Sequence, residues 1–296
     1  MTTPPIAPPA AVPAKGKTIP LAILPKEGEG KPLVWDESRR RFQLGDAILT
    51  AADLSLALAF AIVKPLPSPW RGGVLFDDGA RRTLRIGNAD TRNAARDSSD
   101  VLLSLQVMGP FLIDSLVTAW WYRGSKDVAT EIALIDLETM TITAAVQGAF
   151  TTFSARERPY GQTCGGELPE NSIDCRTFGR YRSYFSGHTS LAFTSGSLVC
   201  WHHLELHLFE DATTDALSCV GAMTAAVATG ALRVMSDQHY TTDVMTGAIV
   251  GMGIGFGMPY LLHGKRSSMS APTERASDLT LRVVPTGLGA SAVGTF

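Results

Sequence analysis

The sequence predicts an all-α fold: a six-helix bundle embedded in a membrane, with a candidate active site at one end. Three observations lead to this prediction. Six mostly apolar segments are long enough, or nearly so, to cross a bilayer core of roughly 30 Å. Charge is unevenly distributed, with only 7 charged side chains between residues 189 and 263. The last segment also carries regularly spaced glycines. The six segments cover residues 47–63, 101–121, 128–150, 187–207, 216–235 and 240–262.

Composition excludes some classes of protein. The chain has 296 residues, of which 45% are apolar and 18% charged, so it has ample apolar surface to bury and is not disordered overall. The net charge of −2 gives no indication of a nucleic-acid partner, because nucleic-acid binders usually carry a basic surplus. Residues 1–44 are proline-rich and basic and are expected to be disordered. Residues 45–263 then form the helical core, and residues 264–296 a flexible tail.

Acidic residues interrupt the first three segments. A carboxylate at the centre of a bilayer costs roughly 2.5–3.5 kcal/mol on insertion scales, so each should face the bundle interior. These residues are Asp53, Asp114, Glu131, Asp136 and Glu138. A soluble all-helical bundle is the alternative interpretation.

The flanking basic residues predict the orientation. With six crossings, residues 39–41, Arg123 with Lys126, and Lys265 with Arg266 all fall on one side. The positive-inside rule assigns that side, and both termini, to the cytoplasm. We therefore expect an integral membrane protein of the bacterial inner-membrane type, with its active site facing the periplasm or outside.

The connection over residues 64–100 falls on the outer side and is basic. Its Arg81, Arg82 and Arg85 could attract anionic headgroups, although a solvated basic loop is the simpler interpretation. Gly247, Gly251 and Gly255 in the sixth segment have a four-residue spacing. In a soluble helix each would cost about 1 kcal/mol relative to alanine. In a membrane helix this spacing lets a neighbouring backbone approach closely, which favours the membrane interpretation.

Three short motifs lie at segment ends, opposite the basic clusters. A proline ends a helix and a serine caps one, so each motif alone has a structural explanation. Together they indicate a site, because they bring cations, histidines and a helix start to one end. The motifs are Arg156-Glu157-Arg158-Pro159; Ser186-Gly187-His188; and Arg233 followed by His239 and Asp243.

Such residues suit phosphoryl transfer. His239 and Asp243 are four residues apart and can share a helix face, so Asp243 could accept the Nδ1 proton of His239. The Nε2 atom would then be the nucleophile. His188 could protonate the leaving oxygen, since its reference pKa near 6.5 suits proton transfer in both directions.

The remaining motif residues suit anion binding. The guanidiniums of Arg158 and Arg233 match phosphate oxygens. Ser186 and the N–H groups of Gly187 and His188 stand at a helix start, where anions are favoured. Acidic residues with metal-ligand spacing are not evident in the sequence, so neither a catalytic metal nor another cofactor is expected.

These motifs resemble those of the type 2 phosphatidic acid phosphatase superfamily. Its pattern is Lys, six residues and Arg-Pro; then Pro-Ser-Gly-His; then Ser-Arg, five residues, His, three residues and Asp. The resemblance covers roughly residues 45–263. The matching positions are Arg158-Pro159, Ser186-Gly187-His188, Arg233, His239 and Asp243.

The resemblance implies a phosphatase that hydrolyses a lipid phosphate monoester or pyrophosphate through a phosphohistidine, without a metal. The substrate would be a phospholipid or polyprenyl phosphate that arrives through the bilayer. His239 would be the nucleophile, Asp243 its partner and His188 the general acid. The implied phosphate ligands are Arg158, Arg233, Ser186 and Gly187.

Three positions depart from the superfamily pattern. Thr151 replaces the lysine, Phe185 the proline before Ser-Gly-His, and Leu232 the serine before arginine. The loss of the lysine matters most, because a cation near a dianionic phosphate contributes several kcal/mol of transition-state stabilisation in a dry site. Arg156 is the first candidate to substitute as a phosphate-binding cation, with Arg180 and Arg182 as alternatives.

The cysteines fall into two pairs. Cys164 and Cys175 lie in the loop between the first two motifs and could form a disulfide if that loop is outside, or remain free thiols. Cys200 and Cys219 lie in apolar segments and are interpreted as core packing. The run Trp201-His202-His203, with His207, is interpreted as interfacial rather than metal-binding.

Three alternatives to a membrane phosphatase remain. A vanadium-dependent haloperoxidase shares the anion pocket of the superfamily, but membrane helices and modest length argue against it. A non-catalytic lipid-phosphate-binding member is suggested by Thr151 but is at odds with the intact His188, His239 and Asp243. A soluble acid phosphatase would change the location more than the chemistry.

Overall fold

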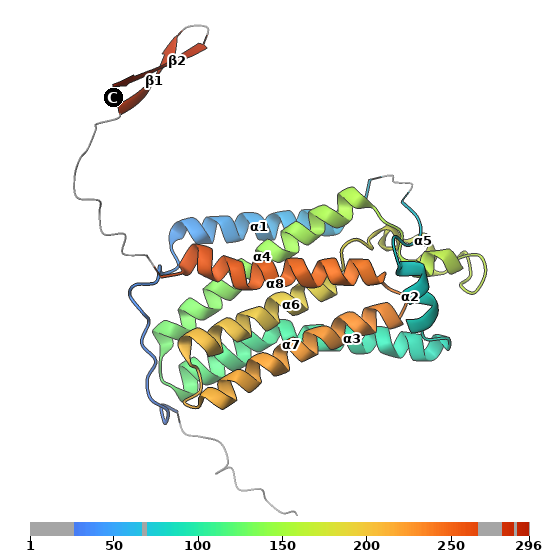
Figure 1. The fold of residues 1–296 in the computed structure, drawn as a ribbon, viewed down its shortest axis with the longest axis horizontal. Coiled ribbons are helices and arrows are strands. Elements are labelled where there is room, and N and C mark those ends of the chain that lie inside the picture. The colour runs from blue at the N-terminus through green and yellow to red at the C-terminus, as the bar shows by residue number, and fades with distance from the viewer. Residues whose placement is uncertain (1–26, 67–69, 266–279, 287–288, 296) are drawn as a thin grey trace, which may run out of the picture.

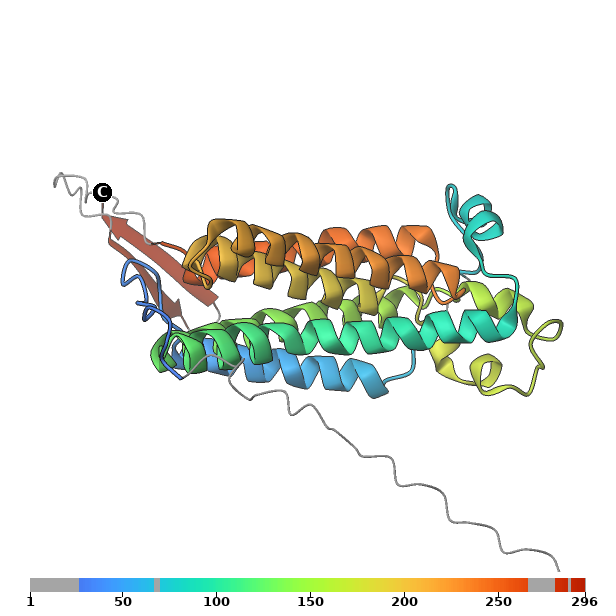
Figure 2. The same cartoon turned by 90° about the horizontal axis from the view of Figure 1, so that it is seen from below.

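The computed structural model describes residues 27–66, 70–265, 280–286 and 289–295, and most of them form an elongated helical bundle (Figures 1 and 2). Eight α-helices occur in these residues, so the expected count of six is not confirmed. Six helices are long and correspond to the six predicted segments, while two are short and lie at one end. The α-helices are α1 (Leu44–Ile62), α2 (Asp77–Leu84), α3 (Ala89–Gly109), α4 (Lys126–Ser154), α5 (Ile173–Arg176), α6 (Gly187–Trp201), α7 (Ala212–Met235) and α8 (Thr241–His263).

The bundle exposes apolar side chains and buries polar ones. The buried residues of α1 are Asp46 and Thr50, whereas Leu44 is 78% exposed. By length and composition, four helical segments of the described residues can cross a membrane: Leu44–Ile62, Ala89–Tyr122, Ala212–Met235 and Thr241–His263. The other two long helices, α4 and α6, are the most enclosed and bury many polar residues. This distribution suits a lipid environment.

Five acidic residues were predicted to face the bundle interior, and three of them are buried there. Asp114, Asp136 and Glu138 are buried, and Glu138 pairs with His263 at 2.7 Å. Asp53 and Glu131 are half-buried. Burial of the three carboxylates inside the bundle avoids the cost of exposing them to an apolar surface.

The interpretation of His202 and His203 as interfacial residues is wrong. Both are buried. His202 lies 2.9 Å from Asp114 through Nδ1 and 3.0 Å from Asp136 through Nε2. The Nδ1 atom of His203 lies 2.6 Å from Asp215. The sequence did not reveal these partners, because they come from three other helical segments.

The helix that contains α3 begins 12 residues earlier than predicted. The Asn88 side chain accepts a hydrogen bond from the Thr91 N–H at 2.9 Å and caps the helix, which continues as a π-helix over Pro110–Tyr122. Its 34 residues span about 51 Å at 1.5 Å per residue, more than the roughly 30 Å of a bilayer core. The polar first turns therefore extend beyond the apolar part and bring Ser99 and Asp100 to the end of the bundle that carries the motifs.

The glycines of α8 let it lie against α6. A Cβ at Gly247 would lie 2.7 Å from the Ser186 carbonyl oxygen, and one at Gly255 would lie 2.6 Å from the Ser197 Cβ. The close approach predicted from the glycine spacing is confirmed. Because Ser186 begins the second motif, this contact also fixes the position of the candidate site.

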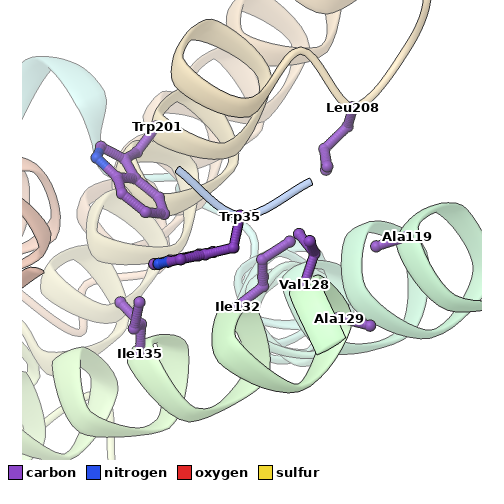
Figure 3. Close-up of a cluster of buried hydrophobic side chains, with 8 residues drawn as sticks. All are labelled: Trp35, Ala119, Val128, Ala129, Ile132, Ile135, Trp201 and Leu208. Carbon is purple, nitrogen blue, oxygen red and sulfur yellow. The ribbon is translucent and has the colours of Figure 1, made fainter. Parts of the chain in front are cut away.

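Residues 27–43 are ordered, although residues 1–44 were expected to be disordered; residues 1–26 lie outside the described residues. The segment crosses the end of the bundle opposite the motifs, where the N–H of Gly28 donates to the carbonyl of Trp121 at 2.9 Å. Trp35 is 2% exposed and packs in an apolar cluster with Trp201, Ile132 and neighbouring side chains (Figure 3). The burial of Trp35 anchors this segment.

The tail contains an element that the sequence analysis did not anticipate. Strands β1 (Thr280–Thr286) and β2 (Gly289–Thr295) pair in antiparallel fashion, with Thr280 opposite Thr295.

Two disulfides connect the cysteines. Cys164 and Cys175 are bridged, as the sequence allowed, with Cα atoms 5.9 Å apart. Cys200 and Cys219 are also bridged, a pairing that their interpretation as core packing did not include. The second bridge joins the end of α6 to the start of α7.

Candidate active site

The predicted motifs meet at one end of the bundle, around a pocket of about 290 Å³. The C-terminal ends of α4 and α7 and the N-terminal ends of α6 and α8 lie together there (Figure 1). His239, His188, Arg158 and Gly187 line the pocket. The other lining residues are Leu103, Gln147, Thr151, Arg182 and Leu191.

His239 lies in the turn between α7 and α8 and is 2% exposed. Its Nδ1 atom lies 2.8 Å from the carbonyl oxygen of Ser183. A carbonyl oxygen only accepts hydrogen bonds, so Nδ1 carries the proton and Nε2 keeps its lone pair. Burial, reinforced by the charges of Arg158 and Arg233, holds the pKa of His239 well below its usual value. The imidazole is therefore neutral with a free Nε2, which is the form a nucleophile needs.

Asp243 does not contact His239 as the four-residue spacing suggested. The His239 Nδ1 atom and the nearest Asp243 carboxylate oxygen are 3.9 Å apart. Asp243 instead accepts hydrogen bonds from the Ser183 hydroxyl at 2.6 Å and from the Tyr240 N–H at 2.9 Å. Ser183 therefore lies between the two residues, since its hydroxyl donates to Asp243 while its carbonyl accepts from His239. The sequence analysis missed Ser183, which has no motif of its own.

The short helix α2 holds the turn that carries His239. Asp237 adopts a left-handed conformation with φ of 62°. Its carboxylate accepts two hydrogen bonds of 2.7 Å from Arg81 and one of 2.8 Å from Arg85. The interpretation of these arginines as solvated loop residues is therefore wrong. Bidentate arginine–carboxylate contacts are geometrically specific, so α2 fixes the backbone two residues before His239.

His188 and Arg233 meet through a residue that the sequence analysis missed. Asp100, in the middle of α3, has one carboxylate oxygen 2.8 Å from His188 Nε2 and 2.7 Å from Arg233 Nη1. Arg233 also donates to the Ser99 hydroxyl at 3.0 Å. A half-exposed carboxylate thus contacts the predicted general acid and one predicted phosphate ligand. The only sequence signal was the Asn88 cap, which extends the helix far enough to include Asp100.

Of two further predicted phosphate ligands, Arg158 lines the pocket, whereas Ser186 is buried and is not a lining residue. Arg158 donates to the Gln238 side chain at 2.6 Å, and burial lowers its pKa from the usual value. A half-buried cation of this kind favours the arrival of an anion. Ser186 caps α6, with its hydroxyl oxygen accepting from the Thr189 N–H at 3.3 Å.

Gly187 lies close to the Gln147 side chain. A Cβ at this position would lie 3.0 Å from the Gln147 side chain, which lines the same pocket. Glycine therefore lets the start of α6, with its free N–H groups, approach α4.

Arg156 does not line the pocket. Its side chain is buried and its guanidinium pairs with Asp77 at 2.8 Å and Asp243 at 2.5 Å. It also lies between the rings of Trp70 and Tyr240, at 4.8 and 4.2 Å from the ring centroids. These contacts satisfy its charge within the protein.

Two residues relevant to the missing lysine do line the pocket. Thr151 donates to the Gly148 carbonyl at 3.0 Å, so its hydroxyl is engaged by its own helix. Arg182 lines the same pocket and donates to the carbonyls of Phe60 and Val63, both at 2.6 Å. Arg180 pairs with Glu157 at 2.6 Å and is not a lining residue.

The chain matches a known protein family over part of its length. The model of the PAP2 superfamily matches residues 133–267. The match begins within α4 and includes all three predicted motifs, whereas Asp100 and α2 lie before it. No curated protein matches the chain. The three motifs thus lie within the part of the chain that matches the PAP2 superfamily, the family that they resemble.

Proposed function

We propose that the chain is an integral membrane phosphatase that hydrolyses a lipid phosphate monoester or pyrophosphate through a phosphohistidine on His239. The observation that carries this proposal is the 2.8 Å contact between His239 Nδ1 and the Ser183 carbonyl. It assigns the proton to Nδ1 and leaves Nε2, in a pocket lined with cations, free to attack.

In the first step, Nε2 of His239 attacks the phosphorus atom. A phosphorus–nitrogen bond forms as the bond to the leaving oxygen breaks, and protonated His188 gives its proton to that oxygen. In the second step, a water molecule attacks the phosphohistidine, and the now neutral His188 accepts the proton of this water. Inorganic phosphate leaves, and His239 regains its lone pair.

Charge on the transferring phosphoryl group is stabilised by Arg158, Arg233 and the N–H groups at the start of α6. Arg182 is favoured over Arg156 as the cation that replaces the missing lysine, because Arg182 lines the pocket beside Thr151. Arg156 is instead a positioning residue for Asp243, to which it is bonded at 2.5 Å.

The substrate would reach this site from the bilayer. The outer surfaces of α1, α3, α7 and α8 expose many large apolar side chains, including Leu105 and Ile249. The basic residues that predict the cytoplasmic side lie at the other end of the bundle, where Arg41 contacts Asp127 at 3.0 Å and Arg40 donates to the Leu262 carbonyl at 3.1 Å. This arrangement supports a site that faces the periplasm or outside.

Phosphate release tests the proposal. The full chain, purified in detergent with excess chelator, is supplied with phosphatidate, phosphatidylglycerol phosphate, a polyprenyl pyrophosphate and p-nitrophenyl phosphate. The expected result is turnover of at least one lipid by the wild type, loss of turnover in His239→Asn, and unchanged turnover in His207→Asn. His207 is an exposed histidine at the opposite end of the bundle, so it is a matched control.

Three outcomes would overturn the proposal. Lipid phosphate binding without turnover would indicate a non-catalytic binding protein. Turnover that persists in His239→Asn would exclude the phosphohistidine route. Halide oxidation that depends on added vanadate, in place of inhibition by vanadate, would indicate a haloperoxidase.

A further inference from the structure

A second pocket, of about 680 Å³, lies beside the C-terminal end of α1 and shares no lining residue with the candidate active site. Three basic side chains line it: Lys64, which follows α1; Arg71, in the next described segment; and Arg176, at the end of α5. Three separate parts of the chain therefore each contribute a basic residue to the lining of one pocket.

These three cations have no protein counter-charge in the part of the chain that the structure describes: no ion pair or side-chain hydrogen bond involves them there. Other arginines at this end are paired, such as Arg81 with Asp237 and Arg180 with Glu157. Three unpaired cations around one pocket repel one another, and an anion that binds there removes this repulsion. Guanidinium and ammonium groups both bind phosphate oxygens well.

Apolar residues indicate where such an anion comes from. Leu66, Phe178 and Tyr181 also line the pocket. Next to it, Ile62 and Ile173 are 78% and 77% exposed. The cations thus lie at the boundary between the apolar surface of α1 and the polar loops, which is the level of lipid phosphates in a membrane.

The pocket is held in place by covalent and polar contacts. The Cys164–Cys175 disulfide includes a lining residue and ties α5, with Arg176, to the loop after α4. Arg182 joins the end of α1 through the Phe60 and Val63 carbonyls, and its guanidinium lies 5.1 Å from the Phe178 ring centroid. Arg182 therefore lies between this pocket and the active-site pocket, which it lines.

We propose that Lys64, Arg71 and Arg176 bind the phosphate group of an anionic phospholipid that is retained rather than hydrolysed, with its acyl chains against α1. Phosphate is the chemistry recognised, and the exposed apolar surface favours a lipid over free phosphate as its source. The inference rests on the membrane placement in the proposed function but not on turnover.

Lipid retention tests the proposal directly. The full chain is equilibrated in detergent with equal amounts of phosphatidylglycerol and phosphatidylcholine of the same acyl chains, and bound lipid is counted by native mass spectrometry. The wild type is expected to retain phosphatidylglycerol selectively. The triple variant Lys64→Gln, Arg71→Gln and Arg176→Gln is expected to lose about tenfold or more of this selectivity, as expected for the loss of three headgroup cations.

Two matched variants exclude trivial explanations. A control triple variant removes the same charge outside the pocket, through Lys31→Gln, Arg82→Gln and Lys126→Gln, and should keep the selectivity. The charge-conserving variant Lys64→Arg, Arg71→Lys and Arg176→Lys should restore most of it. Equal loss in the control variant would overturn the proposal, because attraction would then come from net charge rather than from the pocket.

One further measurement distinguishes a lipid from free phosphate as the bound anion, and another distinguishes lipid retention from the proposed phosphatase activity. Inorganic phosphate at 10-fold molar excess over lipid should not displace the retained phosphatidylglycerol; displacement would reassign the pocket to free phosphate and overturn the lipid assignment. Hydrolysis of p-nitrophenyl phosphate should be unchanged in the Gln triple variant. The retention assay does not depend on turnover. If the wild type shows no phosphatase activity but retains phosphatidylglycerol selectively, and the Gln triple variant loses that selectivity, only the proposed phosphatase function is contradicted.

Discussion

The carboxylate of Asp100 contacts both His188 and Arg233, at 2.8 and 2.7 Å. A phosphate that binds Arg233 must displace the carboxylate from the guanidinium, while Asp100 keeps its contact with His188. The substitution Asp100→Asn removes the charge while keeping the size of the side chain, so competition with the incoming anion should weaken.

The magnitude follows from the hydrogen bond between Asp100 and Arg233. Hydrogen bonds to charged groups contribute about 1.5–3 kcal/mol, against about 0.5–1.5 kcal/mol for neutral ones. The Asp100 side chain is 51% exposed, so solvent screens the difference and about 1 kcal/mol in total is reasonable. Asp100→Asn should therefore tighten inhibition by vanadate or phosphate about fivefold.

The same substitution should lower kcat. Without the carboxylate, His188 loses the partner that favours its protonated form, and the general acid weakens. The loss should be larger for a lipid alkoxide than for p-nitrophenolate, which leaves without needing a proton. Inhibition constants and kcat for the two substrates measure both effects. Weaker vanadate inhibition in Asp100→Asn would refute the reasoning, because Asp100 would then assist anion binding rather than compete with it.

Three further predictions concern pH, a buried ion pair and helix packing. Because burial keeps His239 neutral, the acidic limb of kcat/KM due to this residue should lie well below pH 6.5. Unfolding then takes up a proton, so the free energy of unfolding should fall as the pH decreases from 6.5 toward the pKa of His239 in the folded protein. Activity and thermal unfolding measured between about pH 4 and 8 test both effects. Arg156→Ala leaves two buried carboxylates unpaired and should cost about 3–5 kcal/mol of stability, seen as a lower Tm, whereas full stability would exclude the buried pairing. Gly251→Ala places a methyl group against the Ser190 carbonyl and should reduce both Tm and kcat, while the exposed Gly253→Ala should change neither.

The predictions that succeeded rest on local sequence. Helix periodicity and apolar length located the six long helices, and the end of each helix then determined where its motif lies. This is why His188, Arg158 and His239 could be predicted to share one end of the bundle before any contact was known. The glycine spacing of α8 likewise predicted a close neighbour, because only the absence of a Cβ explains glycines that a helix otherwise disfavours.

The predictions that failed depend on contacts between distant segments. The polar turns before residue 101 looked like part of a loop, so Asp100 was not considered. Ser183 could not be recognised because its role uses a backbone carbonyl, which every residue possesses. Arg156 was preferred to Arg182 as a substitute cation because it lies close to Arg158 in sequence, yet its guanidinium is paired with Asp77 and Asp243 from distant segments.

Long-range pairing also explains the remaining differences. Cys200 and Cys219 are 19 residues apart on two helices, and nothing in their apolar surroundings indicates that the helix ends meet. His202 finds Asp114 and Asp136 on other helices. Buried polar partners of this kind cannot be assigned from spacing along one segment, since they are set by how the helices pack.

The position of the phosphoryl group on His239 tests the central claim most directly. ³²P-labelled p-nitrophenyl phosphate is mixed with the His188→Asn variant, and the labelled peptide is mapped by mass spectrometry. In this variant p-nitrophenolate still leaves, because it needs no proton, whereas hydrolysis of the intermediate lacks its base. Phosphorus NMR distinguishes the two ring nitrogens. We predict an acid-labile, alkali-stable phosphate on Nε2 of His239, because Nδ1 is held by the Ser183 carbonyl at 2.8 Å. A phosphoryl group on Nδ1, or hydrolysis by direct attack of water with no labelled histidine, would contradict the account.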